Sequence, residues 1–166
     1  DNGAHALNAY DPADLSVEYK EGIYVGYRWA EKQDVKPLFA FGHGLSYTDF
    51  TYGEAECSKS SVKAGSDVTV SVDVTNSGKV AGKEVVQLYI GDDESSVDRP
   101  VKELKGFRKI SLEPGETKTV TFTIEPDMLK YFDAAKHEWV LENGKFTAYV
   151  GSASDDIRTT VQFEVR

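Results

Sequence analysis

The sequence is short of cysteine, histidine and long apolar runs, and each shortage excludes a class of protein. Cys57 is the only cysteine, so an internal disulfide and a cysteine-based zinc site are both excluded. Three histidines with no helical pairing predict no other metal site. No segment approaches the ~18 consecutive apolar residues that span a bilayer, so no membrane partner is expected. The first residues lack a basic start and an apolar stretch, which leaves the cellular compartment open.

Positive charge is also scarce relative to negative charge. The chain has 28 acidic and 19 basic residues, for a net charge of −9. This balance repels phosphate backbones and argues against a nucleic-acid partner. The glycine pair around His43 lacks the Lys-Ser/Thr of a phosphate-binding loop, so no cofactor is predicted. His43, Ser46 and Asp49 are the residue types of a catalytic triad, but their closeness in the chain favours a structural role.

From residue 52 onward, short strand patterns recur at close spacing. Valines at 68, 70, 72 and 74 alternate with polar residues, as in a strand with one buried face. Further strands are predicted at 84–90, 101–110, 117–124, 139–141, 145–150 and 159–165, with a helical turn at 126–132. The Glu-Asn-Gly at 142–144 predicts a hairpin between its flanking strands. About seven short strands predict an all-β fold, a fibronectin-III/immunoglobulin-like antiparallel β-sandwich.

The first 51 residues do not follow this pattern. Ten of the 19 aromatic residues lie between Tyr10 and Tyr52, where regular patterns are few. A strand is predicted at 19–29, and the remainder is an extended, aromatic-rich arm. Aromatic side chains bury ~150–250 Å² each, and this segment is too irregular to build a core around ten of them. We therefore expect residues 1–51 to pack on the sandwich of residues 52–166, on a second copy, or on other domains.

Several motifs resemble family 3 glycoside hydrolases, the β-glucosidase family. Residues 19–29 (YKEGIYVGYRW) resemble the segment that leaves the family's second domain, and residues 37–48 (PLFAFGHGLSYT) resemble its linker motif PLFPFGxGLSYT. Residues 84–89 (EVVQLY) and 99–107 (RPVKELKGF) continue the match into the sandwich. Ala30 and Ala40 depart from the pattern. The resemblance runs from about residue 16 to the end, and it implies the family's C-terminal fibronectin-III-like domain with its preceding linker.

The resemblance implies that this chain alone is not an enzyme. In the family, the nucleophilic aspartate and the acid/base glutamate lie in two domains upstream of the matched segment, so no catalytic residue is assigned. The expected function is a non-catalytic accessory module that stabilises or docks onto the catalytic domains, with hydrolysis of β-glycosidic bonds performed by the full-length enzyme. The candidate interface residues lie in the arm: Tyr27, Arg28, Trp29, Phe39, Phe41, His43 and Tyr47.

Two alternatives remain open at this stage. The module itself could bind a polysaccharide or lignin, which exposed coplanar aromatic rings on one sheet face would favour. The arm could also drive self-association of the isolated chain. Trp139 lies in a predicted strand and is expected in the core, whereas Trp29 is expected at an interface or near the sugar site of an intact enzyme.

Overall fold

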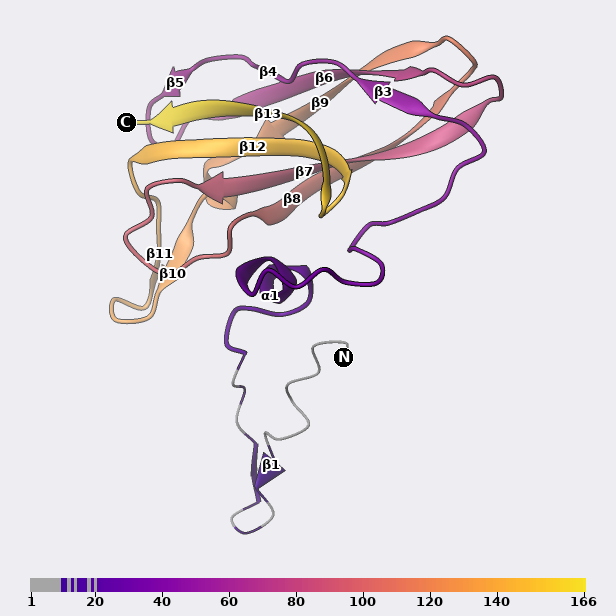
Figure 1. The fold of residues 1–166 in the computed structure, drawn as a ribbon. Coiled ribbons are helices and arrows are strands. Elements are labelled where there is room, and N and C mark those ends of the chain that lie inside the picture. Colours follow the sequence, from indigo (N-terminus) through magenta and orange to yellow (C-terminus); the bar gives the residue numbers. More distant parts are fainter. Residues whose placement is uncertain (1–9, 12, 14, 18, 20) are drawn as a thin grey trace.

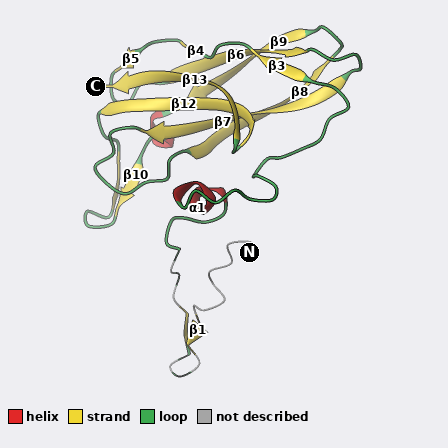
Figure 2. Cartoon of the chain, in the orientation of Figure 1, coloured by secondary structure: helices red, strands yellow, loops and turns green. Residues whose placement is uncertain are grey.

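The computed structural model describes residues 10, 11, 13, 15–17, 19 and 21–166, and the sequence expectations for residues 1–9 lie outside this range. Two stacked β-sheets form the body, and a short helix lies beside them at the start of the chain (Figure 1). Figure 2 shows how little helix the chain contains. The expected all-β sandwich is confirmed.

The larger sheet has five strands in the order β5-β13-β12-β7-β8. These strands are β5 (Ser61–Val62), β13 (Asp156–Val165), β12 (Gly144–Ala153), β7 (Gly82–Asp92) and β8 (Glu103–Leu112). Neighbours are antiparallel except β5 and β13, which run parallel.

The second sheet is organised around β6 (Val68–Asn76). One edge of β6 pairs with β9 (Thr117–Ile124), and the other pairs in turn with β3 (Phe50–Tyr52) and β4 (Glu56–Cys57). Outside the two sheets are the hairpins β1 (Tyr10–Asp11) with β2 (Ser16–Val17) and β10 (Tyr131–Asp133) with β11 (Glu138–Val140). A 3₁₀ turn at Pro126–Met128 lies where one helical turn was predicted.

Alternating side chains of both sheets fill the space between them. The four predicted valines of β6 are at most 2% exposed, and Val86, Leu88 and Ile90 face them from β7. The rings of Phe146 and Phe163 stack with centroids 5.8 Å apart. This packing of β-branched and aromatic residues on facing pleats holds the sandwich together.

Two local predictions are wrong. Instead of a strand at 19–29, the described residues from Glu21 form turns followed by the helix α1 (Tyr27–Lys32). The Glu-Asn-Gly at 142–144 does not form a hairpin, because β11 pairs with β10 while β12 joins the large sheet. The described residues contain no helix long and apolar enough to cross a bilayer.

Candidate functional site: the arm on the outer face of the large sheet

The outer face of β7 is covered, although it points away from the core. Gln87 and Tyr89 alternate with the core residues of this strand, so their side chains lie on the opposite face. Gln87 is nonetheless only 4% exposed and Tyr89 is fully buried. What buries them is the arm, which returns over the large sheet and places α1 beside it (Figure 1).

Tyr27 joins α1 to this face. Its ring meets Tyr89 edge-on with centroids 5.7 Å apart, and it lies 5.2 Å from the ring of Phe41. The Tyr27 hydroxyl accepts a 2.8 Å hydrogen bond from the backbone N–H of Leu104 in β8. A helix of six residues is unstable alone, so these contacts with the sheet are what stabilise α1.

Three ion pairs surround this aromatic contact, and their signs alternate between the two partners. Arg28 of α1 lies 3.3 Å from Glu103, and Lys32 lies 2.8 Å from Asp98. Between them in sequence, the Glu31 carboxylate accepts a hydrogen bond from the ammonium of Lys102. Along the helix the charges are positive, negative and positive, and each one faces a residue of opposite charge on the sandwich. An alternating pattern of this kind fixes the register of the helix, because a shift would oppose like charges.

Lys102 is the most deeply buried charge at the junction. It is 7% exposed, and its ammonium lies 5.7 Å from the ring centre of Tyr89 and 5.9 Å from that of Tyr149. Burial lowers the pKa of this ammonium, while the Asp155 carboxylate partly opposes the shift. The second oxygen of the Glu31 carboxylate is buried with no hydrogen-bond partner among the described residues. The contact between Lys102 and Glu31 is therefore the main interaction that offsets the cost of removing their two charges from water.

Arg99 forms a second charged centre a few residues away. Its guanidinium donates to the Asp92 carboxylate at 3.0 Å, to the Leu129 carbonyl at 3.1 Å and to Glu103 at 3.4 Å. Burial raises the pKa of Asp92 in spite of this contact. Burial would also raise the pKa of Glu103, but the charges of Lys105, Arg28 and Arg99 outweigh it and hold that pKa below its ordinary value.

The linker after α1, residues 33–49, is held to the sandwich at its middle and at its far end. At its middle, the backbone N–H of Ser154 donates to the Phe41 carbonyl at 2.9 Å. Gly42, at φ +86°, lies so close to the Gln87 side chain that a Cβ there would collide with it. At the far end, the Thr48 hydroxyl donates a 2.7 Å hydrogen bond to the fully buried amide of Asn76. The linker is thus held by specific contacts and has a defined path.

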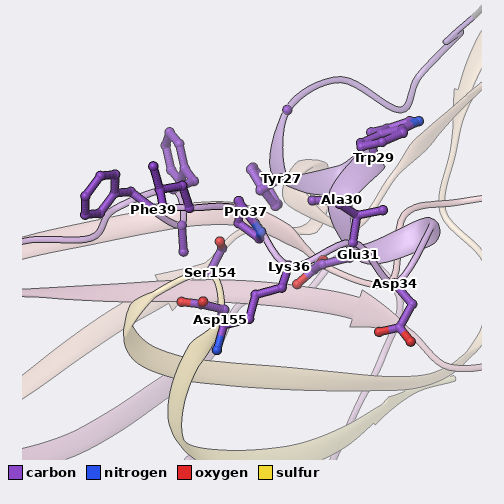
Figure 3. A pocket seen from close by; sticks show the side chains of 15 residues that line it. Tyr27, Trp29, Ala30, Glu31, Asp34, Lys36, Pro37, Phe39, Ser154 and Asp155 are labelled. Atoms are coloured by element: carbon purple, nitrogen blue, oxygen red, sulfur yellow. The ribbon is translucent and has the colours of Figure 1, made fainter. Parts of the chain in front are cut away.

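The same linker points large apolar side chains away from the sandwich. Phe39 is 69% exposed, and Leu38, Leu45 and Tyr47 are each at least 90% exposed. An open cleft of about 1080 Å³ lies between α1, residues 34–41 and the Ser154–Asp155 turn. Figure 3 shows Trp29 at one end of this cleft and Phe39 at the other, with Ser154 and Asp155 between them.

The seven candidate interface residues therefore fall into two groups. Tyr27 and Arg28 contact the sandwich of the same chain, as described above. The other five lie along the cleft or on the outward side of the linker: Trp29, Phe39, Phe41, His43 and Tyr47. Within this second group, the ring centroids of His43 and Phe39 are 5.4 Å apart.

Sequence reasoning missed the polar residues that join the arm to the sandwich. These are Glu31 in the arm and Lys102 and Gln87 on the sandwich, and no sequence pattern marks any of them as a contact residue. The apolar run at 84–90 was the available signal, because a strand without polar alternation is buried on both faces.

The prediction that Trp139 lies in the core is also wrong, because its side chain is 64% exposed. It lies in the β10–β11 hairpin, which extends beyond the two sheets and leaves its outer side chains without a facing layer (Figure 1). Among the described residues, no group of three or more His, Cys, Asp or Glu side chains is placed to hold a metal ion.

Comparison with known proteins agrees with this architecture. Residues 84–154 match a family model described as a fibronectin type III-like domain. The chain matches the C-terminal, fibronectin type III-like region of family 3 glycoside hydrolases. The fibronectin type III-like match begins in β7 and ends just after β12, so it contains the outer face that the arm covers.

The most informative relatives are β-glucosidases. The chain is 53% identical to β-glucosidase BoGH3A of Bacteroides ovatus over 156 residues, which are 94% of this chain and 21% of that protein. It is 51% identical to the thermostable β-glucosidase B of Acetivibrio thermocellus, over 87% of this chain and 19% of that protein. A crystal structure of a β-glucosidase from Kluyveromyces marxianus superposes with a TM-score of 0.84 at 44% identity, over 90% of this chain and 18% of that one. The chain thus spans about a fifth of its relatives and does not include their catalytic domains.

Proposed function

We propose that this chain is the non-catalytic accessory module of a family 3 β-glucosidase, and that it docks onto the catalytic domains and stabilises them. The observation that carries the proposal is a linker with a defined path whose large apolar side chains point outward. Exposed apolar surface on a segment held in one conformation is typical of an interface. The relatives, about five times longer than this chain, supply a partner for that surface.

In this proposal the arm has two differently used sides. Tyr27 and Arg28 hold it to the sandwich, while Phe39 and Tyr47 contact the catalytic domains together with Leu38 and Leu45. Residues 1–51 then act as an adaptor between those domains and the sandwich of residues 52–166. Strand β3 (Phe50–Tyr52) spans this boundary and pairs with β6, so adaptor and sandwich are joined by a continuous strand.

The catalytic part of the proposal is tested by assaying hydrolysis of an aryl β-glucoside. We expect turnover by the full-length polypeptide and none by the 166-residue chain. Turnover by the isolated chain that survives repeated purification would contradict the proposal, because the carboxylate pair of a retaining glycosidase would then have to lie here.

The docking part is tested with Leu45→Ser and Tyr47→Ser. These side chains are 95% and 101% exposed in this chain, so we expect the melting temperature of the isolated chain to change by less than about 2 °C. In the full-length polypeptide, the same changes should shorten the half-life of activity at elevated temperature severalfold. Thr123→Ser, at an exposed site on β9 of the second sheet, is the control and should alter neither. An unchanged half-life in both linker variants would refute docking through this surface.

Polymer binding is supported less well. Exposed Trp139 favours it, but its ring meets that of Phe132 at 67°, so the two do not form a flat platform for a sugar chain. Depletion of the isolated chain by insoluble cellulose, xylan or lignin is the measurement that would revive this function. Self-association through the linker would instead be seen as a concentration-dependent sedimentation coefficient, abolished by Tyr47→Ser.

A further inference from the structure

The β10–β11 hairpin carries an exposed aromatic pair that the proposed linker contact does not use. Phe132 and Trp139 lie directly opposite each other in the register, with ring centroids 5.6 Å apart. They are 49% and 64% exposed. Tyr131 and Val140, the next pair along, lie on the other face of the ribbon, which places Phe132 and Trp139 on its outer face.

Arg99 ties this hairpin to the arm. Its guanidinium donates to the Leu129 carbonyl just before β10 and lies 6.0 Å from the ring centre of Tyr131 in β10. Its own carbonyl accepts a 3.3 Å hydrogen bond from the hydroxyl of Tyr24 in the arm. The guanidinium side chain is 11% exposed and held by two carboxylates. Arm and hairpin are therefore linked through one residue whose side chain is largely buried, and Figure 1 shows α1 and the hairpin on the same side of the sandwich.

Exposed apolar side chains are concentrated along this side. Among the described residues, every large apolar side chain that is exposed belongs to the arm, to the 93–101 loop or to the hairpin, except Val80 and Phe107. Val97 and Val101 lie in the loop, at 40% and 54% exposure, on either side of Arg99. The loop lies between arm and hairpin, because Asp98 and Arg99 contact the arm and Arg99 also contacts Leu129 just before the hairpin. Exposed apolar side chains gathered in neighbouring segments are typical of an interface.

We propose that Phe132 and Trp139 form a second docking contact for the catalytic domains of the same polypeptide. This inference rests on the proposed function, because the partner is the one that the linker contacts. The relatives are about five times the length of this chain, so the polypeptide outside it is large enough to cover linker and hairpin together. Two contacts linked through Arg99 would fix the orientation of the sandwich, whereas the linker contact alone would leave it free to pivot.

Hydroxyl-radical footprinting of the isolated chain and of the full-length polypeptide tests this inference. We expect Phe132 and Trp139 to be oxidised at least fivefold more slowly in the full-length polypeptide, without added sugar. Phe107, 61% exposed on β8, is the matched control and should be oxidised at the same rate in both. Phe39 and Tyr47 report independently on the linker contact.

Equal oxidation of Trp139 in both proteins, with Phe39 and Tyr47 protected, would overturn the second contact and leave the proposed function intact. Protection of Trp139 only after addition of glucose would overturn it in favour of a sugar contact. If Phe39 and Tyr47 are unprotected as well, the proposed function fails with it. As a second measurement, the Phe132→Ser/Trp139→Ser double variant should shorten the thermal half-life of the full-length activity severalfold more than Phe107→Ser does. Equal half-lives for these two variants would also overturn the inference.

Discussion

Replacing Glu31 by glutamine would test whether the buried ion pair holds the arm to the sandwich. The change keeps the shape of the side chain and one acceptor for Lys102, but it removes the charge. The Lys102 and Glu31 side chains are 8% and 20% exposed. Neutralising one partner of a buried pair costs ~3–5 kcal/mol, and we expect about 3 kcal/mol because the Glu31 side chain retains some contact with water.

The free energy of unfolding is measured by urea denaturation, followed through the fluorescence of Trp29 and Trp139. For a domain of this size, 1 kcal/mol corresponds to ~2–4 °C, so the melting temperature should fall by about 6–12 °C. The matched control is Lys32→Gln, which breaks the Lys32–Asp98 pair with side chains 42% and 66% exposed. We expect the control to cost less than about 1 kcal/mol, because exposed pairs contribute little.

A double-mutant cycle with Lys102→Met separates this pair from its surroundings. In the double variant neither charge is buried, so we expect it to recover at least half of the stability lost in Glu31→Gln. A coupling energy within about 0.5 kcal/mol of zero would refute the reasoning, because the two side chains would then act independently. Faster hydrogen exchange confined to α1 would show that Glu31→Gln releases the arm rather than the whole fold.

Three further outcomes follow from contacts described above. Gly42→Ala should lower stability by about 1–2 kcal/mol and speed hydrogen exchange in the linker, because φ +86° disfavours a side chain and the new methyl collides with Gln87; an unchanged melting temperature would contradict the fixed linker path. Asn76→Asp should cost about 2–4 kcal/mol at neutral pH, because it removes the amide donor to the Val80 and Leu112 carbonyls and buries a charge. The stability lost in Asn76→Asp should shrink as the pH falls and the new carboxyl is protonated. A loss that does not change with pH would exclude the charge as the cause. Glu103 has a lowered pKa in the folded protein, so its stabilisation is present above the unfolded value near ~4.3 and is lost as the pH falls through the folded value. Denaturation between pH 7 and pH 3 should therefore be less pH-dependent in Glu103→Gln than in the unchanged chain, and equal slopes would refute this.

The sandwich could be predicted because apolar and polar residues alternate along its strands, and this alternation is visible in the local sequence. In β6 every second residue is a valine, and this alternation determines which face is buried without reference to other parts of the chain. The family motifs in the linker were equally readable, because glycine at position 42 is required by backbone conformation and by the close approach of Gln87.

The helix and the exposed hairpin could not be predicted in the same way. Gly26 precedes α1 with no side-chain cap, and six residues are too few to specify a helix without the sheet that stabilises them. Trp139 lies in a strand of three residues, which is too short for alternation to show which side faces a core. Both features depend on elements that are far away in the sequence but close in space, and the local sequence does not show which elements those are.

The burial of Gln87 and Tyr89 under the arm has a consequence for exchanging modules between enzymes. A hybrid joined at residue 52, where the strand pattern begins, would strip the outer face of β7 and leave Lys102 without its acid. Its new host would have to supply an aromatic ring, a carboxylate and a glycine in the same three places. A crossover upstream of Glu21 would instead carry the sandwich together with its own cover, and it would leave the outward side chains of the linker and the Phe132–Trp139 pair to be matched to the host.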